Sequence, residues 1–157
     1  MADDYLSGVS IRGFGDGDKD LINAFFDQMG GESRAFFNRG DGNRAYAMRF
    51  FGGEAANNRY YLAESGGRMV GYVFLYEMDT AVPWLGIAVS EDFKGKRLGQ
   101  KLIEHVVEVA RAENKGGILL TTHTANFRAQ ALYERCGFKF MGDHTSGEKL
   151  YLLRFAA

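Results

Sequence analysis

The sequence predicts an α+β fold. Its mixed, mostly antiparallel sheet would contain a central parallel β-α-β crossover and carry helices on both faces. Short strand-like apolar runs alternate with segments whose apolar residues recur at helical spacing. Two of these runs are joined by the turn Ser65-Gly66-Gly67, which is typical of a β-hairpin. A strand, a long helix and a second strand follow one another over 84–124, an order that makes those two strands parallel.

The N-terminal half predicts one strand, two or three helices and the hairpin. Asp18 is a suitable N-cap for the first helix, whose apolar residues lie at helical spacing. The aromatic-rich stretch that follows predicts one short and one longer helix. Its aromatic residues would cover more than one helix face, which suits a pocket wall. The expected elements are strand 9–13, helix 18–29, helices 34–38 and 44–51, and strands 59–64 and 68–78.

The C-terminal half opens with the run 84–89, which is apolar on both faces and therefore predicts the central strand. A long helix is expected from Leu98, with Gly116 as its C-cap. Asn126 is a good N-cap for the next helix, which Gly137 ends. The remaining elements expected are strands 118–124, 139–142 and 150–155, with 143–148 as a hairpin loop.

The composition bounds the class of protein. A chain of 157 residues that is 46% hydrophobic suits one domain, expected over 1–157. The net charge of −1 argues against a general nucleic-acid binder. The single cysteine, Cys136, allows no intrachain disulfide and favours a reducing compartment. No apolar run approaches the roughly 18 residues of a membrane span. The N-terminus has no signal-peptide pattern, so we expect a cytoplasmic protein.

Two segments carry chemistry. The first, "VSEDFKGKRLGQKLI", leads from the central strand into the long helix. Gly95 and Gly99 allow close approach of the backbone, and three basic residues add charge where the helix N-terminus already favours anions. The second is the helix after Asn126, in which Tyr133 lies within the apolar stripe. A phenol there needs a hydrogen-bond partner or a cavity. Each segment alone has a plain structural reading as well.

The two segments together resemble the GNAT superfamily of N-acetyltransferases. The acetyl-CoA signature of that family, R/Q-x-x-G-x-G/A, follows a strand and opens a helix. Here Lys94 stands at the Arg/Gln position, Arg97 at the middle glycine, and Gly99 matches. A second family motif is close to N-x-x-A-x-x-L-Y-x-x-x-G-F. It is complete as Asn126, Ala129, Leu132, Tyr133, Gly137 and Phe138.

The resemblance implies an acetyl-CoA-dependent N-acetyltransferase with the GNAT fold. Its central strand would separate from the next strand and bind the acetyl and pantetheine groups through its backbone. Asn126 would contact the pantetheine arm, and Tyr133 would protonate the departing thiolate. The backbone of the basic turn would hold the pyrophosphate. The implied cofactor-binding residues are Ile87, Ala88, Val89, Lys94, Gly95, Lys96, Arg97, Leu98, Gly99, Gln100, Asn126 and Tyr133.

Arg97 is the main departure from the family pattern. A side chain there would crowd the pyrophosphate if the backbone needed a positive φ. We expect instead that Arg97 lies in the first helical turn, where arginine is tolerated and adds charge.

Acetyl transfer to an amine also needs a base, because a lysine-like amine is mostly protonated at neutral pH. Several family members carry a Glu before the first motif, where this chain has Pro83 and Trp84. Glu77 is the first candidate, since its strand should flank the central one. The other candidates are Asp79, His123, Glu54 and Glu64.

The acceptor would be a primary amine on a small molecule or a peptide, bound over 36–51. Arg34, Arg39, Arg44 and Arg49 there suggest an acidic group on it. No metal site is expected, because three scattered His and one Cys lack the spacing of ligands. Either a monomer or a homodimer is consistent with the sequence. The alternatives are a catalytically silent acyl-CoA-binding sensor of the same fold and a plain interaction domain.

Overall fold

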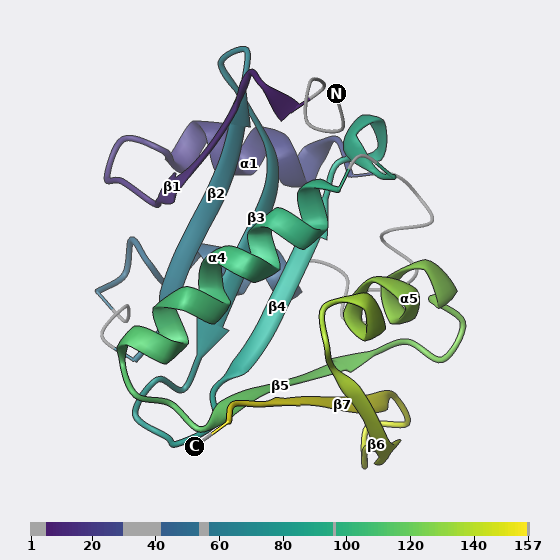
Figure 1. Cartoon of the computed structure of the whole chain (residues 1–157). Coiled ribbons are helices and arrows are strands. Elements are labelled where there is room, and N and C mark those ends of the chain that lie inside the picture. The colour runs from purple at the N-terminus through teal and green to yellow at the C-terminus, as the bar shows by residue number, and fades with distance from the viewer. Residues whose placement is uncertain (1–5, 30–41, 54–56, 96, 157) are drawn as a thin grey trace.

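A central β-α-β unit flanked by antiparallel strands organises the chain, as expected (Figure 1). The computed structural model describes residues 6–29, 42–53, 57–95 and 97–156, so the helix expected at 34–38 lies outside the described residues. The described elements, in chain order, are β1 (Val9–Gly13), α1 (Lys19–Asp27), α3 (Gly42–Met48), β2 (Arg59–Ser65), β3 (Arg68–Tyr76), β4 (Trp84–Val89), the 3₁₀ turn η2 (Glu91–Phe93), α4 (Leu98–Ala112), β5 (Gly117–Thr122), α5 (Phe127–Arg135), β6 (Lys139–Asp143) and β7 (Lys149–Arg154).

In the described part of the chain the strands form one seven-stranded sheet in the order β1-β2-β3-β4-β5-β7-β6. Neighbouring strands are antiparallel except for β4 and β5, which are parallel. The predicted fold class and the central position of β4 are therefore confirmed. A parallel pair needs a long crossover, and α4 supplies it.

The parallel pair β4–β5 is unusually short. Only Trp84 and Leu119 are bridged among the described residues, with the Leu119 N–H donating to the Pro83 carbonyl oxygen at 2.9 Å. Beyond this point the two strands diverge, which Figure 1 shows as a widening gap between β4 and β5. β4 keeps its other edge paired with β3 throughout, from Tyr76–Trp84 to Gly71–Val89.

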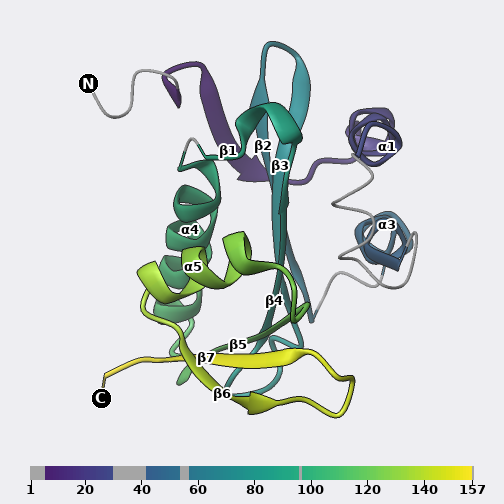
Figure 2. The ribbon, with the colours of Figure 1, turned by 90° about the vertical axis from the view of Figure 1, so that its right-hand side faces the viewer.

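Helices cover both faces of the sheet. Figure 2 shows the sheet edge-on, with α1 and α3 on one side and α4 and α5 on the other. The core under α4 and α5 is mostly aliphatic and includes Val73, Leu102 and Leu120. The core under α1 is mostly aromatic and includes Tyr72 and Phe74, whose rings stack at 4.4 Å. The aromatic content of the sequence is thus concentrated on one face.

Three details of the helix ends differ from expectation. Asp18 does lie at the N-cap position of α1, but its carboxylate makes no cap hydrogen bond to the helix. It accepts instead from the Arg12 guanidinium, at 2.6 Å, and from the Gly15 N–H, at 2.7 Å, and the Arg12 bond lowers its pKa. α3 ends at Met48 rather than at 51. After α4 the residue in the left-handed region is Asn114, with φ 60°, so the C-cap expected at Gly116 is wrong.

A missing side chain sets the position of α4. A Cβ atom on Gly71, in β3, would lie 3.1 Å from the Ala88 carbonyl oxygen and 3.2 Å from Leu102 Cδ1. Leu98, the first residue of α4, also packs against this point. α4 can therefore approach the sheet closely at Gly71, and this contact places the N-terminus of α4 beside the end of β4.

We predict that Gly71→Val destabilises the fold by about 1–3 kcal/mol, since overpacking a filled core costs about that much. Urea denaturation measures the difference. Gly13→Val is the matched control, because Gly13 lies in the edge strand β1 and a Cβ there would meet only the Tyr60 carbonyl oxygen, at 3.8 Å. Equal stability losses in the two variants would contradict the close approach of α4 at Gly71.

Candidate active site

A cleft of about 1070 Å³ occupies the gap between β4 and β5, and its walls come from both faces of the sheet. Leu98 and Tyr133 line it from the α4 and α5 side, and Tyr46 and Trp84 line it from the α1 and α3 side. Its volume is at the upper end of the range of small-molecule sites. It can therefore take a ligand that extends through the sheet, together with a second molecule.

One end of the cleft is the turn that leads into α4. The first hydrogen bond within α4 runs from the Lys101 N–H to the Arg97 carbonyl oxygen, at 3.1 Å. The three preceding amides have no partner inside the helix, and the helix dipole makes this end positive. The turn residues that line the cleft are Lys94, Gly95, Arg97, Leu98, Gly99 and Gln100; Lys96 lies outside the described residues. This end is suited to a phosphate group.

Arg97 does not lie in the first helical turn, and that expectation is wrong. It is the residue before α4, with φ 66° and ψ 10°, in the left-handed region. Such a backbone costs a non-glycine residue roughly 1–2 kcal/mol. The family signature has glycine at this position, so the chain keeps the backbone turn although it carries an arginine. Arg97 is exposed and lines the cleft.

Gly99 has a packing function that the sequence did not reveal. A Cβ atom there would lie 2.8 Å from Leu132 Cδ2, on α5. The absence of a side chain therefore lets α5 pack against the first turn of α4. Since both residues line the cleft, this contact also sets the width of the cleft beside the N-terminus of α4.

Local hydrogen bonds hold α5 and, through it, Tyr133. The Asn126 side chain accepts from the Ala129 N–H at 3.2 Å, so the predicted N-cap is confirmed. The Gln130 amide donates to the His123 carbonyl oxygen at 3.1 Å and ties α5 to the end of β5. Gly137 ends the helix with φ 96°. α5 is thus fixed at both ends and directs Tyr133 into the cleft.

Tyr133 is 7% exposed and packs beside Phe138 and Tyr151. Its hydroxyl makes no hydrogen bond to any residue that the structure describes. Burial raises the pKa of Tyr133, and electrostatic interactions with Cys136 and Glu148 raise it further. The phenol is therefore protonated throughout the neutral range and can donate a proton to a ligand in the cleft.

The opposite wall of the cleft is aromatic. Tyr76 lies over β4, because a Cβ on Gly86 would be 2.8 Å from the Tyr76 hydroxyl. Its ring contacts that of Tyr46, on α3, with centroids 4.6 Å apart, and Arg49 lies 4.5 Å above the Tyr46 ring. Trp84 and the nearby His144 ring continue this wall.

The arginines expected at the acceptor site are only partly brought together. Arg49 lines the cleft, whereas Arg44 donates to Asp27 at 2.8 Å and lies over the Phe26 ring. Arg34 and Arg39 lie outside the described residues.

The candidate bases are scattered. Glu77 lines the cleft and is exposed, in a left-handed turn with φ 57°. His123 also lines the cleft, but its Nδ1 accepts from the Ala125 N–H at 3.0 Å, which favours the tautomer with a proton on Nε2. Asp79 is exposed and does not line the cleft, and Glu64 pairs with Arg12 at 3.3 Å. Glu54 lies outside the described residues.

Among the cleft residues that were not singled out from the sequence are Thr121, at the end of β5, and Glu148, just before β7. The Thr121 hydroxyl donates to Glu148 Oε1 at 2.9 Å. The two residues are 27 positions apart and meet only because β5 pairs with β7. A glutamate in a hairpin loop carries no signal of this kind.

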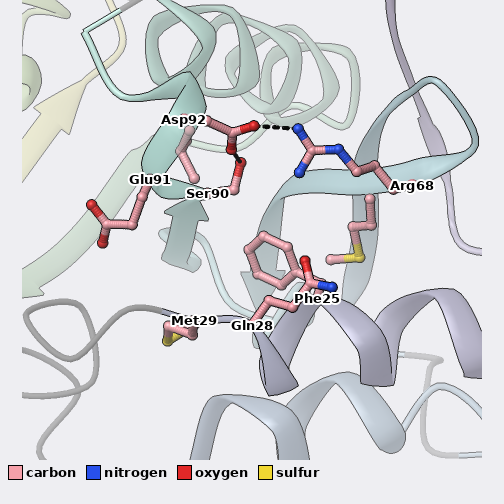
Figure 3. A pocket seen from close by; sticks show the side chains of 9 residues that line it. Phe25, Gln28, Met29, Arg68, Ser90, Glu91 and Asp92 are labelled. Carbon is pink, nitrogen blue, oxygen red and sulfur yellow. Dashed lines mark hydrogen bonds and ion pairs between the residues drawn. The ribbon is translucent and has the colours of Figure 1, made fainter.

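A second, smaller pocket lies beside the end of β4 (Figure 3). Phe25 and Met29 of the α1 segment face Ser90, Glu91 and Asp92 across it. Its charged residues are paired, since the Arg68 guanidinium donates to the Asp92 carboxylate and the Lys94 ammonium donates to Glu91 at 3.0 Å. At about 170 Å³ it is smaller than typical small-molecule sites, so the cleft remains the candidate active site.

The described residues include no group of three or more His, Cys, Asp or Glu side chains arranged to hold a metal ion. None of the described helices is both long and apolar enough to span a bilayer.

Several known proteins resemble this chain in sequence. The sequence model of the Acetyltransferase (GNAT) family matches residues 22–138. The chain is similar to the 5-NmdU N-acetyltransferase of Pseudomonas phage PaMx11, with 33% identity over 110 residues that cover 66% of this chain and 75% of that protein. It is also similar to the N-acetylaspartate synthetase of Mus musculus, with 34% identity over 89 residues. These residues cover 54% of this chain but only 30% of that protein.

Solved structures share the fold. The GNAT domain of S. lividans PAT superposes with a TM-score of 0.83 at 16% identity, covering 94% of this chain and 90% of that one. The spermidine N-acetyltransferase from Vibrio cholerae, solved in complex with CoA and spermine, superposes with a TM-score of 0.71 at 18% identity. The superposition covers 93% of this chain and 94% of the spermidine N-acetyltransferase chain. At these identities the likeness shows the fold alone.

The left-handed backbone at Arg97 can be tested by comparing glycine with alanine. We predict that Arg97→Gly is more stable than Arg97→Ala by about 0.5–1 kcal/mol. Glycine relieves a strain of about 1–2 kcal/mol, partly offset by the greater freedom of the unfolded chain. Urea denaturation gives the difference.

The same pair of substitutions at Lys101 serves as the control. Lys101 is exposed and lies in regular helix, so there alanine should be the more stable by about 1 kcal/mol. If alanine were also the more stable residue at position 97, the left-handed turn would not persist in solution.

Proposed function

Because this chain belongs to the acetyltransferase (GNAT) family, we propose that it transfers an acetyl group from acetyl-CoA to a primary amine by direct attack in a ternary complex. The observation that carries the proposal is the cleft itself. It runs from the N-terminus of α4, past a buried phenol, to an aromatic wall on the other face of the sheet. A donor bound from one face can therefore meet an acceptor bound from the other.

The donor would lie along β4. On the side of β4 that faces the gap, the backbone from Ile87 through Ala88 to Val89 has no neighbouring strand among the described residues, so it can bind the pantetheine arm and the acetyl carbonyl. The turn before α4 would hold the pyrophosphate. Asn126 uses its side-chain oxygen for the helix cap, so its amide NH₂ is the group that would contact the donor. The presence of CoA in the structurally similar spermidine N-acetyltransferase supports this donor class.

Tyr133 would act as the general acid. The amine nitrogen attacks the thioester carbonyl carbon and forms the C–N bond, and the electron pair of the broken C–S bond stays on sulfur. That thiolate takes the phenol proton of Tyr133, and a proton from the acylated nitrogen restores the phenol. A raised pKa keeps Tyr133 in the acid form up to at least about pH 10, so the phenol alone gives no alkaline fall in rate below that pH.

The acceptor would enter across the aromatic wall of Tyr46, Tyr76 and Trp84. Similar proteins carry names that refer to acceptors as different as 5-NmdU and spermidine, so the cleft of this chain has to indicate its own. Flat rings suit an amine borne on a flat or extended apolar group. Arg49 lines the same part of the cleft and would favour an acceptor that also carries an anionic group.

We predict that Tyr133→Phe lowers the turnover number by about 10²-fold or more, because the leaving thiolate loses its proton donor. Affinity for acetyl-CoA should stay within about twofold, since the ring remains in place. Thiol release with a panel of polyamines, amino sugars and peptides measures turnover, and calorimetric titration measures the affinity.

Tyr151→Phe is the matched control for this variant. Tyr151 is buried beside Tyr133 but does not line the cleft, so its loss should leave turnover nearly unchanged. Full turnover by Tyr133→Phe would overturn the proposed acid. Tight binding of acetyl-CoA without thiol release from any amine would instead support a silent CoA-binding sensor.

A further inference from the structure

We infer that Glu148, held in place by Thr121, binds the ammonium group of the acceptor and takes its proton before attack. This inference rests on the proposed acetyl transfer. A lysine-like amine has a pKa near 10.4, so only about 1 molecule in 2,500 is neutral at pH 7. The reaction therefore needs a proton acceptor at the reacting nitrogen, and that group must lie where the two strands separate.

Thr121 stands at that point. It lies two residues after Leu119, the residue through which β5 is bridged to β4. Its neighbours Leu120 and Thr122 alternate with it, and Leu120 belongs to the core under α4. Since side chains alternate along a strand, Thr121 faces the other side of the sheet, the side of Tyr76 and the aromatic wall.

Glu148 reaches the same place from the β6–β7 hairpin. Thr121 is paired with Leu150, two residues beyond Glu148, so all three side chains lie on one face of the sheet. The hairpin that carries Glu148 is tightly held, because the His144 N–H donates to the Glu148 carbonyl oxygen at 2.8 Å and the Glu148 N–H donates to Ser146 Oγ at 3.3 Å. The backbone of Glu148 is therefore fixed by the hairpin, and its carboxylate is oriented by the Thr121 hydroxyl.

Only one oxygen of the Glu148 carboxylate accepts a hydrogen bond from a described residue. Oε1 accepts from the Thr121 hydroxyl at 2.9 Å, whereas Oε2 has no hydrogen-bond or ion-pair partner among the described residues. Glu148 is half-buried and lines the cleft. One oxygen is thus used to orient the group, and the other is available to an ammonium in the cleft.

Tyr133 and Glu148 approach the gap from opposite faces. Tyr133 comes from α5, on the aliphatic side, and Glu148 lies on the aromatic side. They are close enough for the charge of Glu148 to act on the phenol, where it adds to the effect of burial in raising the pKa of Tyr133. A proton donor for sulfur and a proton acceptor for nitrogen would therefore lie on the two sides of the reacting carbon.

The proton balance is complete. Glu148 takes one proton from the bound ammonium, which leaves a neutral amine with its lone pair directed at the thioester. C–N bond formation and C–S bond cleavage then proceed with the proton exchange at Tyr133 described above. The products are the amide and the CoA thiol, and the proton on Glu148 passes to water.

Glu77 is the competing candidate, since it also lines the cleft. It is exposed in a turn at the start of the β3–β4 connection, where its backbone N–H donates to Asn58 Oδ1 at 3.3 Å and its carbonyl oxygen accepts from the Thr80 hydroxyl at 2.8 Å. Among the residues that the structure describes, none makes a hydrogen bond or ion pair with its carboxylate that would hold it toward the point where the strands separate. The Glu148 carboxylate, in contrast, is held by the Thr121 hydroxyl, and this difference favours Glu148 over Glu77 as the base.

The test compares Glu148→Gln with Glu77→Gln in the full chain, using the best acceptor from the amine panel and hydroxylamine. Glutamine is isosteric and can still accept from Thr121, so folding and acetyl-CoA affinity should be unchanged. We expect Glu148→Gln to lower kcat/KM for the amine by about 10²-fold or more, and Glu77→Gln to lower it less than about threefold. Glu148→Asp should recover part of the loss, and Thr121→Val should cost about tenfold.

Hydroxylamine separates a chemical function from a structural one, because it is largely uncharged at neutral pH and needs no base. The deficit of Glu148→Gln should therefore nearly disappear with hydroxylamine. The inference would be overturned if Glu148→Gln lowered kcat/KM equally for both acceptors or not at all. It would also be overturned if Glu77→Gln, rather than Glu148→Gln, caused the loss in kcat/KM. Absence of turnover by the unaltered chain with every acceptor would instead overturn the proposed function, and this inference with it.

Discussion

The separation of β4 from β5 after a single bridged pair is the constraint on which the rest of the structure depends. Backbone N–H and C=O groups inside a protein need partners, and a fully paired sheet would satisfy them internally. Here the facing edges beyond Trp84 and Leu119 lack each other as partners. An extended ligand can take the place of the missing strand. The cleft is therefore a consequence of sheet geometry rather than of any one side chain.

The same separation gives the gap access to both faces of the sheet, and each face supplies different residues to it. On the aliphatic face, Gly71 lets α4 approach β3, and Gly99 lets α5 approach α4, so two glycines hold a helix N-terminus and Tyr133 at the gap. On the aromatic face, the β6–β7 hairpin carries Glu148 to Thr121. Neither face holds both Tyr133 and Glu148, so the proposed transfer reaction depends on the gap that connects the two faces.

Elements with local signals were predicted well from the sequence. The hairpin of β2 and β3, the start of α4 at Leu98 and the cap of α5 by Asn126 are all as expected, because each depends on residues within a few positions of one another. Asp18 shows the limit of this reasoning. Its place at the start of α1 was correct, but its carboxylate bonds to Arg12 of β1, a partner that a cap rule does not consider.

The proposed donor half of the cleft could be predicted from the sequence and the proposed acceptor half could not, for a physical reason. Backbone amides and a helix N-terminus bind phosphate with little help from side chains, so a short motif specifies them. The motif does not specify backbone dihedral angles. Because arginine rarely adopts a positive φ, the positive φ of Arg97 could not be predicted from the sequence. The acceptor half consists of side chains from α3, β3, β5 and the β6–β7 hairpin. Thr121 and Glu148 become neighbours only when β7 inserts between β5 and β6, and a strand order of that kind has no local signal.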